Sequence, residues 1–296
     1  MILMAVVAKH GIWSNATYPW TDQTSAGYMG SIVAEIDAWI TAISSNSSII
    51  ANGMAPVKKR DPSSSTNSGT RNGFAYEFPD TSIGLDADGP TYPTLIAHGT
   101  ETSFVLEVGD EFEDDTQNNG FGDLGFTPGH LSASSANGSA GFDNEVIICT
   151  ETTDGEEFLA VSFKLGSATA NAIAFLAARD QDGHWMFDIK GLGFVYDPIM
   201  GFWSGASGPY DTDPSGLTLA SSSAFRSYII STGSITGASG RAGYNGEGKG
   251  IWIPKSGKLC GGRNTTSVFG EYLPLANGTE QILGLGYQGP AVIIPA

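Results

Sequence analysis

Only one stretch of this chain repeats its apolar residues at the spacing of an α-helix. Between Ser25 and Ile50 these residues recur at steps of three and four, which places them on one helix face. They are Met29, Ile32, Val33, Ile36, Ile40 and Ile43, and Trp39 widens the face. We therefore predict an amphipathic helix, either exposed to neighbouring subunits or covering a sheet of its own subunit; we favour the interface.

The ends of this helix are predicted from residues that disfavour regular helical backbone. Gly27 and Gly30 weaken the first turn, so we expect the regular part to begin near Ser31. Ser44–Ser48 is a run of short polar side chains that compete for backbone hydrogen bonds, so we expect the helix to end raggedly there.

After the helix, apolar and polar residues alternate in short runs between glycine-rich turns, a pattern typical of β-strands. The expected strands are Phe74–Phe78, Ser103–Val108, Glu145–Thr150, Phe158–Leu165, Ala172–Arg179, Gly193–Tyr196, Ser227–Ile230, Gly250–Ile253 and Gln281–Leu285. The apolar runs Met1–Ala8 and Ala291–Ala296 are expected as strands too, the latter unless it packs on a partner. Ala172–Ile189 fits a helix or a hairpin, and Asp182–Gly183 favours the hairpin.

Many short strands between turns predict a mainly β fold, a β-sandwich or jelly-roll-like body with one N-terminal α-helix and an extended arm. We divide the chain into an N-terminal strand and helix (1–51), a basic polar arm or linker (52–73) and a β-rich body (74–296). The arm contains Lys58, Lys59 and Arg60. These basic residues either contact an acidic neighbour or nucleic acid, or lie in a solvated loop.

The composition limits the kinds of partner that the protein can bind, but it says little about catalytic activity. The chain has 296 residues, 40 of them glycine, and a net charge of −17, so its body would repel nucleic-acid phosphate. It has no apolar run long enough to span a membrane and no recognisable signal peptide. Cys149 and Cys260 are expected to be buried thiols, with a disulfide or metal role as the alternative.

Candidate chemistry is sparse. The four histidines are isolated in sequence, and no nucleophile elbow or phosphate-binding loop is found. We expect His184 to be packed or hydrogen-bonded in its hairpin. The acidic run ending at Asp115 is read as a solvated turn or as part of a calcium loop, the one cofactor considered. Its ligands would be Asp115, Asn119 and Asp123, with Gly120 sixth, but Phe126 occupies the position of the bidentate acid.

An acidic, Gly/Ser/Thr/Asn-rich β-chain with one helix, a basic arm and an apolar end resembles the virion structural proteins of tailed bacteriophages. The resemblance rests on Ser25–Ile50, Asn52–Gly73 and Ala291–Ala296 and on no diagnostic motif. It implies a capsid, connector, tail or baseplate component in the virion, a homo-oligomer that binds copies of itself and other virion proteins. The expected interface residues are Ile32, Ile36, Trp39, Ile40, Ile43, Lys58, Lys59, Arg60, Val292, Ile293 and Ile294.

Two other classes remain open. A carbohydrate-binding or adhesive β-module would need aromatic side chains exposed along one sheet face. A glycan-degrading enzyme would need two carboxylates that face each other across a cleft. The structural subunit remains our first prediction because no motif for catalysis stands out.

Overall fold

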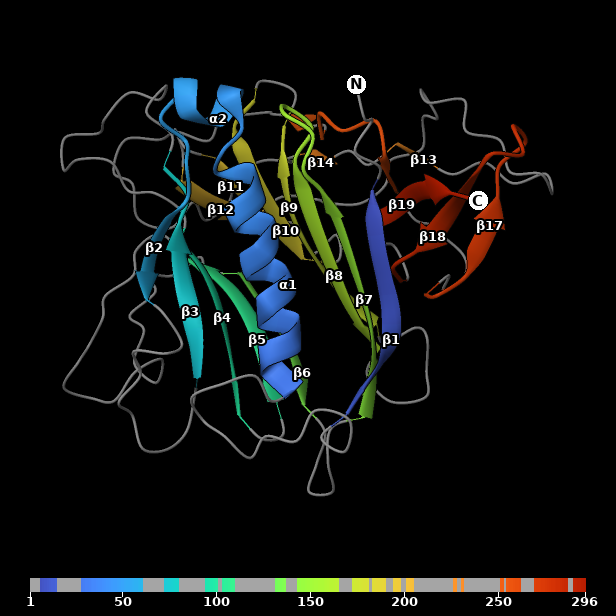
Figure 1. Ribbon diagram of the computed structural model, residues 1–296, viewed down its shortest axis with the longest axis horizontal. Helices are drawn as coiled ribbons and strands as arrows, with labels where there is room; N and C mark the ends of the chain where they lie inside the picture. The colour runs from blue at the N-terminus through green and yellow to red at the C-terminus, as the bar shows by residue number, and fades with distance from the viewer. Residues whose placement is uncertain are drawn as a thin grey trace. The chain divides into compact units, whose positions relative to one another are not determined.

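The computed structural model describes residues 6–14, 28–60, 72–79, 94–100, 103–109, 131–136, 143–164, 172–180, 183–189, 194–197, 201–204, 226–227, 230–231, 251–252, 254–261, 269–286 and 290–296. The described residues are mostly β-strand, as predicted (Figure 1). Contacts divide the chain into unit 1, residues 1–11 and 145–296, and unit 2, residues 12–144. The predicted β-rich body 74–296 therefore contributes to both units.

The first sheet of unit 1 has the strand order β1-β7-β8-β9-β10. Its strands are β1 (Val7–Ser14), β7 (Asp143–Glu151), β8 (Phe158–Lys164), β9 (Ala172–Arg179) and β10 (Trp185–Ile189). β9 and β10 pair antiparallel, and Gly183 in their connection has a φ of 90°. The hairpin interpretation of Ala172–Ile189 is thus confirmed.

The second sheet of unit 1 has the order β13-β16-β19-β18-β17. Its strands are β13 (Arg226–Ser227), β16 (Leu259–Gly261), β17 (Tyr272–Pro274), β18 (Glu280–Gly284) and β19 (Pro290–Pro295). Two short antiparallel pairs also form, β11 (Phe194–Asp197) with β12 (Gly201–Ser204) and β14 (Ile230–Ser231) with β15 (Ile251–Trp252). The apolar C-terminal segment is therefore a strand, and a central one.

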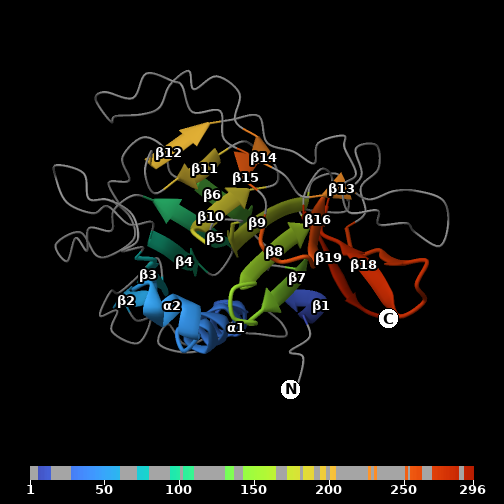
Figure 2. The same ribbon diagram turned by 90° about the horizontal axis from the view of Figure 1, so that it is seen from above.

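The two five-stranded sheets of unit 1 enclose one apolar core, which makes this unit a β-sandwich (Figure 2). The core residues are Val6, Ile147, Cys149, Phe158, Ala160, Ala174, Leu176, Ala178, Met186, Leu259, Phe269, Leu283, Leu285, Val292 and Ile294. Each large apolar side chain buried in this way contributes about 1.5–3 kcal/mol. The predicted sandwich is confirmed, and its core comes from strands of both sheets.

Unit 2 consists of one antiparallel sheet and two helices. The sheet order is β2-β3-β4-β5-β6, with strands β2 (Val57–Arg60), β3 (Asn72–Glu77), β4 (Thr94–Thr100), β5 (Ser103–Gly109) and β6 (Leu131–Ala136). The helices are α1 (Tyr28–Ile43) and α2 (Ser47–Ala51). In Figure 1, α1 lies along this sheet, and it contacts β3 and β4.

The predicted helix exists, but it begins earlier and is broken near its end. α1 begins at Tyr28 rather than near Ser31, so Gly30 does not prevent helical backbone. The break falls in the predicted ragged region. There the Ser44 hydroxyl donates to the Ile40 carbonyl (2.7 Å) and the Ser45 hydroxyl to the Ala42 carbonyl (2.8 Å), which is the expected competition for backbone acceptors.

The predicted interface face of α1 is instead part of the protein core. Ile36, Trp39, Ile40 and Ile43 are each at most 2% exposed, and the Trp39 ring stacks on Phe78 with centroids 6.5 Å apart. These four side chains therefore cannot contact another copy, and the alternative that the helix covers its own subunit's sheet holds for them. The side chain of Ile32 lies outside the described residues.

Of the other two predicted interface segments, the C-terminal one is buried, and the basic one forms the edge strand β2, where the side chains of Lys58 and Lys59 stay partly exposed. Val292, Ile293 and Ile294 are buried in β19, which has a strand on either side. Lys58, Lys59 and Arg60 lie in β2, paired with β3, and not in an extended arm. Pairing with a neighbouring strand satisfies the backbone of a short basic segment that by composition resembles a linker. Residues 61–71 of the predicted arm lie outside the described part.

Candidate functional site

At one end of the sandwich, the core-facing rows of three neighbouring strands change from apolar to polar. Alternate residues of a strand face the same side, and the rows are Val6–Ala8–His10 in β1, Cys149–Ile147–Glu145 in β7 and Phe158–Ala160–Ser162–Lys164 in β8. Ser162 is still buried, and its hydroxyl donates to the Leu285 carbonyl of the opposite sheet. The last residue of each row is ionisable, so three such side chains meet at this end.

His10 connects the two sheets at this end of unit 1. Its Nε2 lies 2.6 Å from Glu145 Oε1, and its Nδ1 lies 3.2 Å from the hydroxyl of Tyr272 in β17. The rings of His10 and Tyr272 lie 6.0 Å apart at 31°. A histidine between a carboxylate and a hydroxyl links the edge strand of one sheet to the edge strand of the other.

Lys164 and Phe269 complete this cluster, which we call the His10 cluster (His10, Glu145, Lys164, Phe269 and Tyr272). Lys164 Nζ lies 3.0 Å from Glu145 Oε2 and 6.0 Å from the centre of the Phe269 ring. The His10 ring meets Phe269 edge to face, with centroids 6.2 Å apart. Glu145 therefore binds one basic group with each carboxylate oxygen.

The backbone beside Phe269 must come very close to His10 to make this arrangement. Gly270 has a φ of +73°, and a Cβ placed there would lie 3.0 Å from His10 Cε1 and 3.4 Å from Glu145 Oε1. Few side chains adopt that backbone conformation, and any side chain would press on the imidazole. Glycine at this position is thus part of how the cluster is built.

The ionisation of the cluster follows from these contacts. Partial burial raises the pKa of the Glu145 carboxyl, but hydrogen bonds from Lys164 and His10 outweigh it, so the pKa lies below its ordinary value. An ionised Glu145 only accepts, so His10 Nε2 carries the hydrogen and, in a neutral ring, Nδ1 accepts from Tyr272. Burial, with a smaller contribution from Cys149, raises the pKa of the Tyr272 phenol, which therefore keeps its proton.

No protein-family model matches this chain, and a search of curated proteins finds no similar sequence. None of the helices in the described residues is long and apolar enough to cross a membrane. Among those same residues, no group of three or more His, Cys, Asp or Glu is placed to hold a metal ion.

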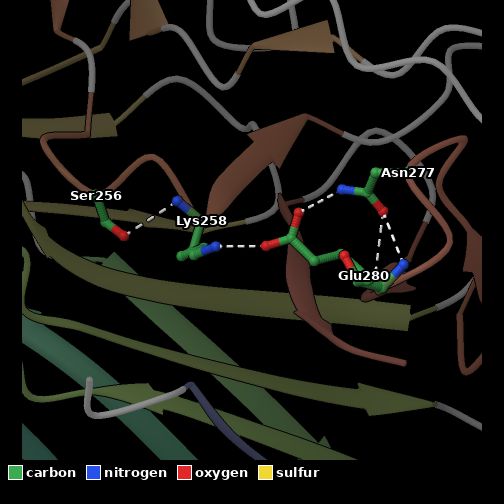
Figure 3. Close-up of polar contacts among 5 residues, drawn as sticks. Ser256, Lys258, Asn277 and Glu280 are labelled. Carbon is green, nitrogen blue, oxygen red and sulfur yellow. Dashed lines mark hydrogen bonds and ion pairs between the residues drawn. The ribbon is translucent and has the colours of Figure 1, made fainter. Parts of the chain in front are cut away.

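A second polar cluster closes the β17–β18 turn of the second sheet (Figure 3). Lys258 Nζ lies 2.7 Å from Glu280 Oε1, and Asn277 Nδ2 donates to Glu280 Oε2 at 2.8 Å. Asn277 Oδ1 also accepts from the backbone amides of Thr279 and Glu280. These contacts, first that of Lys258, lower the pKa of Glu280. The arrangement joins the β17–β18 turn and the start of β18 to the turn that precedes β16.

A third ionisable pair is fully buried. Glu157 and Arg179 are 0% and 2% exposed, with Arg179 Nη1 3.7 Å from Glu157 Oε2. Arg179 Nε donates to the Gly183 carbonyl at 2.5 Å, its guanidinium lies 5.6 Å from the Trp185 ring centre, and Glu157 Oε1 accepts from the Gly155 amide. The pair joins the β7–β8 loop to the β9–β10 hairpin.

In unit 2, the predicted basic residues contact carboxylates of their own chain. Lys58 Nζ lies 2.9 Å from Asp37 Oδ1 and 5.1 Å above the Tyr76 ring, and Lys59 Nζ lies 3.1 Å from Glu77 Oε1. The Tyr76 hydroxyl donates to Asp37. Burial and then this bond raise the pKa of Tyr76 to about 12. Two of the three predicted basic contact residues thus hold β2 to α1 and β3.

The remaining predicted sites divide into those that are described and those that are not. Asp115, Asn119 and Asp123 of the calcium hypothesis lie outside the described residues. Cys149 and Cys260 are buried free thiols, as predicted. The His184 backbone amide donates to Asp180 in the β9–β10 hairpin. The sequence prediction missed the His10 cluster, because its members are far apart in the chain and each of its strands contributes one polar residue.

Proposed function

We propose that this chain is a structural subunit of a virus particle, in the capsid, connector, tail or baseplate, and that it works by symmetric self-assembly. The proposal is supported by the composition and the fold together. The chain is acidic and rich in glycine, its sheets are antiparallel, and clusters of polar side chains hold the strands to one another. Proteins of a particle need strands held in register and an outer surface that stays soluble until it assembles. The partners would be further copies and other virion proteins.

We now assign the contacts between copies to exposed edge strands and no longer to the buried helix face and C-terminal strand. The described apolar side chains of α1 and those of Val292, Ile293 and Ile294 in β19 are internal, so a contact between copies would use other surfaces. Large apolar side chains exposed among the described residues are Val7 in β1, Ile50 in α2, Val57 in β2 and Tyr272 in β17. β1, β2 and β17 are each the last strand of a sheet. An edge strand with an exposed apolar side chain can pair with a strand of another copy.

Two measurements test the proposal. The first asks whether the native protein co-sediments with a large particle from its source, and the second determines the mass of the purified chain in solution by light scattering. Association into a defined oligomer or co-sedimentation with a symmetric particle is the expected result. Val7→Lys and Val57→Lys should weaken association, while Ala51→Lys, an exposed position on α2 with the same added charge, should not. A monomer at every concentration, with no particle-derived partner, would contradict the proposal.

A further inference from the structure

We propose that Tyr272 is a nucleophile toward acyl and sulfonyl donors, with His10 as its general base and Glu145 as the residue that positions the base. This goes beyond an assembly role, since it gives the chain a site of covalent modification or acyl transfer. The inference rests on the contacts of the His10 cluster alone. It concerns Tyr272 in the unassembled chain, where β17 is an exposed edge strand.

The first support is the order of the three groups. A side-chain nucleophile needs a base within hydrogen-bond reach and a third group that orients the base. Tyr272 O lies 3.2 Å from His10 Nδ1, and His10 Nε2 lies 2.6 Å from Glu145 Oε1. Because the ionised carboxylate fixes the hydrogen on Nε2, Nδ1 presents a lone pair to the phenol. The tautomer required of a base is therefore the one that the contacts impose.

The second support is that Tyr272 is accessible while its base is held in place. Tyr272 is 45% exposed, so its side chain is open to a small electrophile. The His10 ring is held on both sides, by Glu145 at Nε2 and by the Tyr272 hydroxyl at Nδ1. A phenol is protonated at neutral pH, and partial burial raises the pKa of Tyr272 further. An unassisted Tyr272 would be a poor nucleophile, and removal of its proton during attack is the step that His10 supplies.

The covalent step balances without any further reagent. The Tyr272 oxygen bonds to the acyl carbon of an activated ester while its proton passes to His10 Nδ1. The bond from that carbon to the leaving oxygen then breaks, and the leaving group takes the proton from His10. With an aryl sulfonyl fluoride, the oxygen bonds to sulfur and fluoride leaves with the proton. Glu145 stays ionised throughout and stabilises the imidazolium that forms.

The test is labelling of the full chain with an aryl sulfonyl fluoride, followed by peptide mass spectrometry of all its tyrosines. We expect Tyr272 to be modified fastest. His10→Gln keeps a hydrogen-bonding side chain but no base and should slow labelling on the order of 100-fold. Glu145→Gln removes the charge that fixes the tautomer and should slow it less. Tyr76→Phe, which removes a tyrosine bound to a carboxylate without histidine, should leave Tyr272 labelling unchanged.

The pH profile of the unmutated protein provides a second measurement that needs no variant to fold. Assistance by an imidazole predicts a labelling rate that rises between about pH 5 and 8, where histidines titrate, and then levels off. A rate that rises only toward about pH 10, where phenols ionise, would overturn the proposal. Labelling of Tyr272 no faster than that of the other tyrosines, or unaltered in a folded His10→Gln variant, would overturn it as well.

Discussion

A hydrogen bond of 2.6 Å links His10 Nε2 to Glu145 Oε1, although 135 positions in the sequence separate the two residues. The bond joins the edge strand β1 to β7, and the second nitrogen of the same ring carries the connection on to β17. A single imidazole thus ties together three strands from two sheets. The stability of this end of the sandwich should depend on the charges around it.

Glu145 is expected to give the protein an acid-sensitive contribution to stability. Its pKa is lower in the folded than in the unfolded chain, so the unfolded chain binds more protons in this range. The contribution is therefore complete above the unfolded pKa and is lost as the pH falls through the folded pKa. For a partly exposed pair we expect about 0.5–1 kcal/mol. The melting temperature should therefore fall less steeply between pH 7 and pH 3 in Glu145→Gln than in the unmutated protein.

Glu280 offers a matched comparison for that measurement. Its pKa is also lowered, by Lys258 and Asn277, but its contacts hold a turn and do not join the sheets. Glu280→Gln should therefore also make the melting temperature fall less steeply at acidic pH, but it should leave the labelling rate of Tyr272 unchanged. Parallel pH profiles for Glu145→Gln and the unmutated protein would contradict the role given to the Glu145 charge.

The sequence predicted the fold class well because the buried strands are strongly patterned. Ala172–Arg179 was predicted with the bounds that β9 has, since a continuous apolar run before Asp182–Gly183 is a strong hairpin signal. β6 was missed because Leu131–Ala136 is mostly serine and alanine. β2 was missed because its lysines resemble a linker, and only their pairing with Asp37 and Glu77 explains them in a strand.

The candidate site could not be predicted in the same way. His10, Glu145 and Tyr272 come from strands that meet only once both sheets have formed, and pairing register is a property of the fold. The alternation within each strand does place His10 in line with Val6 and Ala8. The expected strand, however, ended at Ala8, and alternation alone does not reveal which carboxylate lies opposite His10.

Gly270 is expected to tolerate alanine poorly. Alanine at a φ of +73° is strained, and its Cβ would lie 3.0 Å from the His10 ring, so the imidazole would have to move. Gly278 has a nearly identical φ of +71°, but nothing lies within 4 Å of its Cβ. Gly278→Ala should therefore cost about 1–2 kcal/mol for the backbone alone, and Gly270→Ala about 1 kcal/mol more for the displaced ring. Chemical denaturation of both variants measures the difference.

Equal losses in those two variants would mean that the contact with His10 has no energetic consequence. If the excess loss of Gly270→Ala over Gly278→Ala disappears when His10 is also changed to alanine, the contact is supported. The two substitutions should then be strongly non-additive.

The two cysteines are expected to be unreactive in the folded protein. Burial raises the pKa of the Cys149 thiol to about 12 and also raises that of Cys260, and the thiolate is the reactive form. Iodoacetamide at pH 8 should label neither residue under native conditions and both in denaturant. Labelling of Cys149 at the rate of a free thiol would show that the core of unit 1 opens readily.

Replacing only one residue of the buried pair Glu157–Arg179 should reduce the free energy of unfolding more than replacing both. Arg179→Met leaves the Glu157 carboxylate buried without its positive partner, which typically costs about 3–5 kcal/mol. Adding Glu157→Gln removes that charge but keeps an oxygen for the Gly155 amide, which lies 3.0 Å from Glu157 Oε1. We therefore expect the double variant to be more stable than Arg179→Met alone, although it carries one more substitution. Denaturation midpoints of the two single variants and the double variant form the cycle that measures this coupling. If the two losses simply add, the pair contributes to packing but not through its charges.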